Sequence, residues 1–242
     1  MFPRAQIKEY AKYQFRGYYG TMVGVYIVVA VIAGVSAFTA VGVYLIIPPI
    51  TVGLAFFSFL VYKGWRPEFG ALFSIGFSDY GRVLGGMLWM WLFTFLWALL
   101  FIIPGIIKSI AYSMTPYLLA EYKNIPATQA IRVSMKITYG RKWDIFVMYL
   151  SFIGWGLLAA ITCGLTDILY SGPYKSIAYA GMYDVLRNEA LASGRITQAD
   201  LGFYPGSPLN QPGTTYQQGA QYQQGPQYQQ GAQYQPGAPY QS

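Results

Sequence analysis

Long stretches without a charged side chain dominate the pattern of polar and apolar positions along this chain. No charged residue lies between Arg16 and Lys63, and two further apolar runs follow at residues 83–107 and 145–166. A helix needs about 20 mostly apolar residues to cross the hydrocarbon core of a bilayer, so the first run alone holds about two crossings. The pattern therefore predicts an all-α protein, a polytopic helical membrane bundle.

We expect about six transmembrane helices. Their apolar segments are residues 21–38, 41–62, 83–103, 106–122, 145–166 and 168–186. The second contains Pro48 and Pro49, which are expected to kink it, because a membrane helix tolerates proline where neighbouring groups satisfy the freed carbonyls. For the fourth segment, the alternative to a full crossing is a re-entrant or interfacial segment. The sixth contains Lys175, whose ammonium group must reach the membrane surface.

The positions of Lys and Arg give the expected orientation. The net charge is +7, and the cations gather in short segments between the apolar runs. Loop 63–82 carries both charge signs, whereas loop 123–142 carries cations and no acid. Since cytoplasmic loops hold the excess of Lys and Arg, six crossings with both termini in the cytoplasm place both loops inside. Anionic lipid at the inner leaflet is the expected partner of these charges, and no nucleic-acid partner is expected.

The sequence divides into three parts. Residues 1–20 form a basic amphipathic segment, which we interpret as the start of a signal anchor rather than a cleaved signal peptide. It lies at the headgroup level or acts as a solvated leader. Residues 21–190 form the bundle, with an amphipathic cytoplasmic helix at 126–139, and residues 191–242 form a polar linker and a tail. The cations expected to contact anionic lipid are Arg4, Lys8, Lys12, Arg132, Lys136, Arg141 and Lys142, and the expected interfacial anchors are Trp65 and Trp143.

The tail differs in composition from the rest of the chain. From Tyr216 to Tyr240 a tyrosine recurs every six residues in a Tyr/Gln/Gly/Pro hexapeptide repeat, and no charged residue follows Asp200. Such a segment buries too little apolar surface to offset its chain entropy, so disorder is expected. The tail is either a solvated spacer or a weakly adhesive segment that supports a homo-oligomer or binds a protein partner.

Small residues at four-residue steps predict helix backbones in close approach. The steps are Gly20 and Gly24, Ala30 and Gly34, Ala33 and Ala37, Gly81 and Gly85, and Gly156 and Ala160. They favour a tightly packed bundle and, more weakly, a homo-oligomer.

Ionisable groups inside the expected crossings are few. Lys108 and Glu121 are the candidate intramembrane polar residues, because a charge inside a crossing is a functional hypothesis by default. Since they are 13 positions apart (121 − 108), they lie on roughly opposite faces of one helix and pair poorly. The alternative is that each anchors one end of the fourth crossing at the membrane surface.

The segment 103–155 resembles the uncharacterised bacterial integral membrane proteins grouped as domain-of-unknown-function family 975. The matching pieces are the Ile-Pro-Gly-Ile turn at 103–106, Tyr112-Ser113-Met114, Ala130-Ile131 with Ser134-Met135, Gly140 before Lys142-Trp143, and Leu-Ser-Phe-Ile-Gly-Trp at 150–155. The resemblance covers roughly residues 4–190. It implies a multi-pass protein of the bacterial cytoplasmic membrane, and it implies no particular activity, cofactor or catalytic residue.

The residue types available restrict the chemistry. The sequence has no histidine, one cysteine, Cys163, and no motif such as H-E-x-x-H or G-x-S-x-G. We therefore expect no catalytic, cofactor or metal site. An intramembrane enzyme would need a cavity lined by Glu121 with Asp144 or Asp167. The favoured function is a non-enzymatic membrane protein that organises or binds other components. The alternative is a transporter or channel for a small or amphipathic substrate, which a polar cavity in the bundle would favour.

Overall fold

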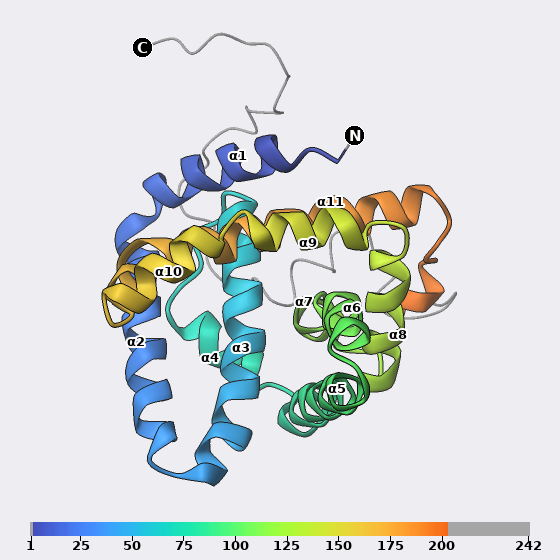
Figure 1. Cartoon of the computed structure of the whole chain (residues 1–242), viewed down its shortest axis with the longest axis horizontal. Helices are drawn as coiled ribbons and strands as arrows, with labels where there is room; N and C mark the ends of the chain where they lie inside the picture. Colours follow the sequence, from blue (N-terminus) through green and yellow to red (C-terminus); the bar gives the residue numbers. More distant parts are fainter. Residues whose placement is uncertain (1, 203–242) are drawn as a thin grey trace, which may run out of the picture.

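The computed structural model describes residues 2–202, and within them the chain is all-helical (Figure 1). The longer helices are α1 (Arg4–Gly17), α2 (Tyr19–Ala37), α3 (Ala40–Tyr62), α5 (Tyr80–Leu100), α8 (Ala127–Thr138) and α11 (Gly172–Ala192). The shorter ones are α4 (Gly70–Gly76), α6 (Ile102–Tyr112), α7 (Thr115–Glu121), α9 (Lys142–Leu150), α10 (Ile153–Ile161), the π-helical turn η1 (Asp167–Ser171) and the 3-10 turn η2 (Ala199–Leu201). The repeat tail expected to be disordered lies outside the described residues.

Four helical segments are long and apolar enough to cross a membrane. They are Tyr19–Ala37, Val41–Tyr62, Tyr80–Leu100 and Lys142–Ile161, the last comprising α9 and α10. These segments coincide with the first, second, third and fifth expected crossings, so the prediction of an all-helical protein with several apolar helices is confirmed. The expected fourth crossing is divided between α6 and α7, and the expected sixth between η1 and α11. Neither is among the four, and the count of six crossings stays a prediction.

The candidate spans run in different directions. Figure 1 looks nearly along α5, whereas α2 and α3 run across the view as an antiparallel hairpin. The α9–α10 segment and α11 lie across the top of this hairpin, with α1 above them. The four candidate spans therefore do not form a parallel bundle in this arrangement.

The α3 helix is the central element of the fold. It packs against α2, α4, α5, α7 and α11, and 61% of its most apolar 18-residue window is buried. The corresponding share is 22% for α2 and 17% for both α5 and α9–α10. Three of the four candidate spans thus leave a broad apolar surface exposed, as lipid-facing helices do.

Two prolines lie within α3, and the helix continues through them. Because Pro49 has no N–H, the carbonyl of Leu45 loses its normal partner in the helix. The hydroxyl of Tyr80, at the start of α5, donates a hydrogen bond to this carbonyl at 3.2 Å. The freed carbonyl is thus satisfied by a neighbouring helix, which is what allows proline inside a membrane-spanning helix.

A close backbone contact joins α3 to α4. A Cβ atom added at Gly53 would collide with the carbonyl oxygen of Leu72, and one added at Gly76 would collide with that of Pro49. The glycines of the expected four-residue steps lie elsewhere. Open space surrounds the Cβ positions of Gly20, Gly34, Gly81, Gly85 and Gly156, and only that of Gly24 meets a neighbour, the ring of Phe69. Within the described residues, the glycines of these steps therefore do not meet the backbone of a neighbouring helix.

Candidate functional site

Four charged side chains from three parts of the chain meet inside the fold. Lys63 follows α3, Glu121 ends α7, and Asp184 and Arg187 are one turn apart in α11. The guanidinium of Arg187 forms ion pairs with the carboxylates of Glu121 and Asp184, the latter at 3.0 Å. The ammonium of Lys63 lies 2.7 Å from the other carboxylate oxygen of Asp184. We call these four residues the buried charge network.

The network is neutral, and its Glu121–Arg187 pair is shielded from solvent. The side chains of Glu121 and Arg187 are only 2% and 6% exposed. The hydroxyl of Tyr183 donates to the second carboxylate oxygen of Glu121, and the ring of Phe59 lies 5.6 Å from the guanidinium of Arg187. Desolvating a charge costs several kcal/mol unless an opposite charge and hydrogen bonds compensate, and here two cations meet two acids. The arrangement ties α3, α7 and α11 together.

The structure separates the two residues expected to be intramembrane polar groups. Glu121 belongs to the buried charge network, whereas the ammonium of Lys108 lies 4.8 Å from the centre of the Trp97 ring, a cation–π contact. The true partner of Glu121, Arg187, is 66 positions further along the chain. Sequence reasoning missed it, because Arg187 directly follows the sixth apolar segment and lies far from Glu121 in the chain.

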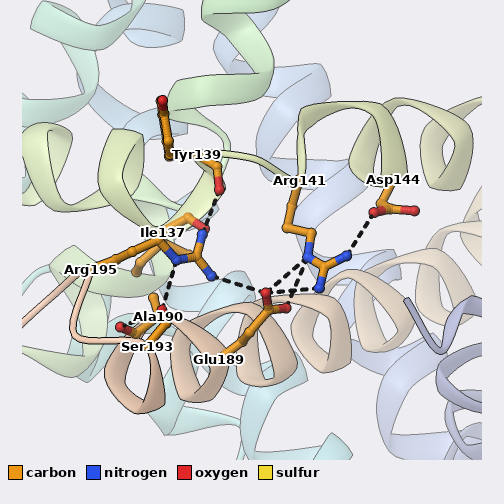
Figure 2. A network of polar contacts seen from close by, with 8 residues as sticks. All are labelled: Ile137, Tyr139, Arg141, Asp144, Glu189, Ala190, Ser193 and Arg195. Atoms are coloured by element: carbon orange, nitrogen blue, oxygen red, sulfur yellow. Dashed lines mark hydrogen bonds and ion pairs between the residues drawn. The ribbon is translucent and has the colours of Figure 1, made fainter. Parts of the chain in front are cut away.

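A second polar cluster joins the end of α11 to the connection between α8 and α9 (Figure 2). The carboxylate of Glu189 accepts hydrogen bonds from Arg141 at 2.9 Å and from Arg195 at 3.2 Å. Arg195 also donates to the carbonyls of Ile137 and Tyr139, which end α8. The hydrogen bond with Glu189 is the main reason why the pKa of Arg141 lies above its ordinary value. This part of the basic loop is thus paired within the protein.

Asp200 pairs with another cation of the basic loop. Its carboxylate lies 2.8 Å from the ammonium of Lys136, and its carbonyl accepts a hydrogen bond from Gln129 at 2.7 Å. Burial by itself would raise the pKa of Asp200, but hydrogen bonds from Lys136 and from the backbone N–H of Thr197 outweigh this and lower it. These contacts hold η2 against α8.

The cations expected to contact lipid therefore fall into two groups. Lys136 and Arg141 are held in the ion pairs above, Arg4 lies 3.9 Å from a carboxylate oxygen of Asp144, and Lys8 donates to Ser151 at 3.3 Å. Lys12 and Arg132 are exposed, and Lys142 is half-buried. The expected interfacial anchors Trp65 and Trp143 are 46% and 73% exposed.

The amphipathic face of α1 is used inside the protein. Its apolar side chains Ile7, Ala11 and Phe15 are buried, and the helix packs against α11. Only the opposite, basic face of α1 is available to a membrane surface. An interfacial helix would insert its apolar side among the lipids, so contact of α1 with lipid in this structure would be electrostatic.

A cavity of about 240 Å³ lies between α3, the break between α6 and α7, α9 and α11. Its lining contains hydroxyl-bearing side chains and no charged one. The break is stabilised from α8, because the hydroxyl of Ser134 accepts the backbone N–H of Met114 at 3.2 Å and donates to the carbonyl of Ala111 at 2.8 Å. Glu121, Asp144 and Asp167 do not line this cavity.

Comparison with known proteins gives one result. Residues 72–190 match the model of the family described as Protein of unknown function (DUF975). This confirms the resemblance over the segment from α4 to the end of α11, which contains Glu121, Asp184 and Arg187 of the buried charge network. The predicted extension to residues 4–71 lies outside the match. No curated protein and no solved structure matches the chain.

Proposed function

We propose that this chain, whose residues 72–190 carry the DUF975 match, is a multi-pass protein of the bacterial cytoplasmic membrane. In this proposal it has six crossings and cytoplasmic termini, and it organises or binds other components at the inner leaflet without catalysing a reaction.

The observation that carries the proposal is the position of the ion pairs. Most of them join chain segments that the charge rule places in the cytoplasm. Lys63 after α3, Glu121 at the end of α7 and Arg141 before α9 all pair with residues in the last part of α11. The other ends of the candidate spans are apolar and exposed, as at Phe38 and Ile161, which are 90% and 80% exposed. This segregation supports the proposed topology.

The proposed topology limits the angles between the helices that cross the membrane. Helices that cross the same bilayer tilt by about 0–40° from its normal. The α5 helix and the α9–α10 segment run in directions different from that of the α2–α3 hairpin (Figure 1). These elements must therefore align with the hairpin when the protein is in a membrane.

The non-enzymatic part of the proposal rests on the contacts that the buried carboxylates make within the protein. Both carboxylate oxygens of Glu121 are engaged, one by Arg187 and one by Tyr183, and Asp184 is shared by Arg187 and Lys63. A group that transfers protons in catalysis needs access to a substrate. These carboxylates contact protein groups, so the network fits a structural role.

A second candidate function is transport of a small or amphipathic substrate. The observation that favours it is the interrupted helix α6–α7 beside an uncharged, hydroxyl-lined cavity. Transporters build their substrate sites from such discontinuous helices. Substrate-dependent flux in liposomes containing the purified protein would support this candidate over the organising role.

Cysteine labelling on intact cells tests the topology. The proposal puts Cys163, which is exposed in the turn after α10, at the outer end of the fifth crossing, so a membrane-impermeant maleimide should label it without permeabilisation. In a Cys163→Ser background, Asn124→Cys should react only after permeabilisation, because the loop after α7 is inside. Reaction of Asn124→Cys on intact cells would refute the cytoplasmic placement of the basic loop.

Partner capture tests the organising role. In-cell crosslinking and mass spectrometry should recover the same membrane or cytoplasmic proteins in repeated experiments. The matched control is a variant that lacks residues 205–242, which distinguishes partners bound by the tail from partners bound by the helical part. Recovery of no reproducible partner by either form would count against the proposal.

A further inference from the structure

The cavity beside the α6–α7 break has a lining of unusual chemistry for its position. Its hydroxyl groups come from five parts of the chain: Thr51 of α3, Ser113 at the break, Tyr117 of α7, Tyr149 of α9, and Ser176 and Tyr179 of α11. Leu54, Ala55, Met114 and Pro116 supply the apolar surface. Since no charged side chain lines the cavity, an ion entering it would lose its hydration without compensation. The lining selects for a neutral molecule.

The hydroxyl groups differ in the hydrogen-bonding capacity that remains for a ligand. Thr51, Ser113 and Ser176 each donate their hydrogen to a carbonyl of the preceding helical turn, at 2.9, 2.7 and 2.9 Å. The oxygen of Thr51 remains as an acceptor, whereas Ser113 and Ser176 also lie within hydrogen-bond reach of Tyr149 and Tyr26. In contrast, the hydroxyls of Tyr117 and Tyr179 make no hydrogen bond within residues 2–202, although both line the cavity. A phenol hydroxyl can donate and accept, so the cavity presents free donors together with acceptors.

The walls hold these groups in place without a ligand. The rings of Tyr149 and Tyr179 are in edge contact, with centroids 4.9 Å apart. The ring of Tyr117 stacks on Tyr183 at 4.9 Å, and Tyr183 is itself bound to Glu121 of the buried charge network. The break at Met114 is fixed by Ser134. A site whose groups are already positioned loses less entropy on binding.

We propose that this cavity is a binding site for a small, uncharged ring compound that carries one hydroxyl or amine group, the class of which phenol is the simplest member. The ring occupies the surface between Leu54, Ala55 and Pro116, next to the tyrosine rings. The hydroxyl accepts from Tyr179 or Tyr117 and donates to the oxygen of Thr51. The volume of about 240 Å³ suits one such ring. The inference goes beyond the proposed function, because it concerns binding by the purified protein and needs neither a partner nor transport.

Phenol binding to the detergent-solubilised full-length protein tests the site, with isothermal titration calorimetry as the readout. Phenol is neutral at pH 7, since a phenol hydroxyl has a pKa near 10. Toluene has a similar size and lacks the hydroxyl. Wild-type protein should bind phenol saturably and more tightly than toluene. In Tyr179→Phe and Tyr117→Phe, which remove only a hydroxyl, we expect phenol affinity to fall about fivefold in at least one variant, while toluene affinity stays unchanged.

Two further variants control for binding elsewhere. Ala55→Phe fills the cavity and should abolish saturable binding of both compounds, whereas Tyr13→Phe, at an exposed position of α1, should bind like wild type. Phenol binding by folded Ala55→Phe protein at the wild-type level would overturn the proposal. If Ala55→Phe does not fold, the tyrosine variants decide. An unchanged ratio of phenol to toluene affinity in both of them, or no saturable binding by wild type, would also overturn it.

Discussion

Arg187 and Glu121 form an almost completely buried ion pair although 66 positions separate them in the chain. The pair connects the middle of the molecule, where α7 ends, to the last long helix. Asp184 and Lys63 extend it toward the surface, where Lys63 is 31% exposed. Because these buried charges balance one another, they fix the positions of α3, α7 and α11 relative to one another.

Breaking this pair from one side should destabilise the protein strongly. Arg187→Met leaves the carboxylate of Glu121 buried without its cation, which costs about 3–5 kcal/mol. The double variant Glu121→Gln/Arg187→Met removes both charges and should recover a large part of this loss. Unfolding by denaturant of these two variants and of the single variant Glu121→Gln, each compared with wild type, gives a double-mutant cycle. Strictly additive effects would show that the two side chains do not interact.

Arg82 should be irreplaceable by lysine. Its guanidinium donates to the carbonyls of Leu119, Tyr122 and Ile125, at 2.7, 3.2 and 3.1 Å. These carbonyls lie at and just after the end of α7. An ammonium group cannot reproduce this fork of donors, and each hydrogen bond to a charged group contributes about 1.5–3 kcal/mol. Arg82→Lys should therefore increase cleavage by trypsin after Lys123. Arg16→Lys, at an exposed position, is the control and should leave the cleavage rate unchanged.

The contact between Asp200 and Lys136 should make the docking of η2 sensitive to acid. The pKa of Asp200 is lowered in the folded protein, so the carboxylate stabilises the fold above its unfolded pKa of about 3.9. This stability is lost as the pH falls through the lower, folded-state pKa. The difference in unfolding free energy between wild type and Asp200→Asn should be complete at pH 6 and shrink below about pH 4. A difference that is constant down to pH 2 would contradict the assignment.

Two glycine substitutions should have opposite effects. Gly53→Ala places a methyl group against the backbone of α4 at Leu72, and a backbone contact cannot relax by rotating a side chain. We expect large destabilisation or failure to fold. Gly34→Ala lies in α2 with open space around its Cβ position, and alanine favours the helix by about 1 kcal/mol. Thermal unfolding in one detergent compares them directly. Equal effects would mean that α4 does not pack on α3 as described.

The apolar runs were sufficient to locate the main helices, because a membrane crossing needs contiguous apolar residues and leaves this signature in the sequence. α2, α3, α5 and the α9–α10 segment fall on expected crossings. The break between α6 and α7 falls beside Pro116, whose position near the start of α7 is a local signal for it. Its stabilisation was not predicted. It depends on Ser134, which lies 20 positions after Met114, and no local pattern reports such a partner.

The buried charge network had a weak signal in the sequence. An acid in an apolar segment requires a cation at the same depth, so the sequence indicates that Glu121 pairs with a Lys or Arg side chain. Lys108 was the cation in the same segment and Lys123 the next one along the chain. Choosing Arg187 instead requires knowing that α11 passes beside α7, which is a property of the three-dimensional fold. In the same way, Glu189 and Asp200, which engage Arg141 and Lys136, come from the segment after Asp184 and could not be assigned by spacing.

The hydroxyl of Ser134 links two regions that the topology assigns to different environments. It belongs to α8, in the basic loop, yet it binds both sides of the helix break that lines the cavity. A displacement of α8 breaks these hydrogen bonds, and a change in the shape of the break pulls on α8. Any molecule that shifts α8 therefore alters the cavity, and by thermodynamic reciprocity an occupant of the cavity changes the affinity of α8 for that molecule by the same factor.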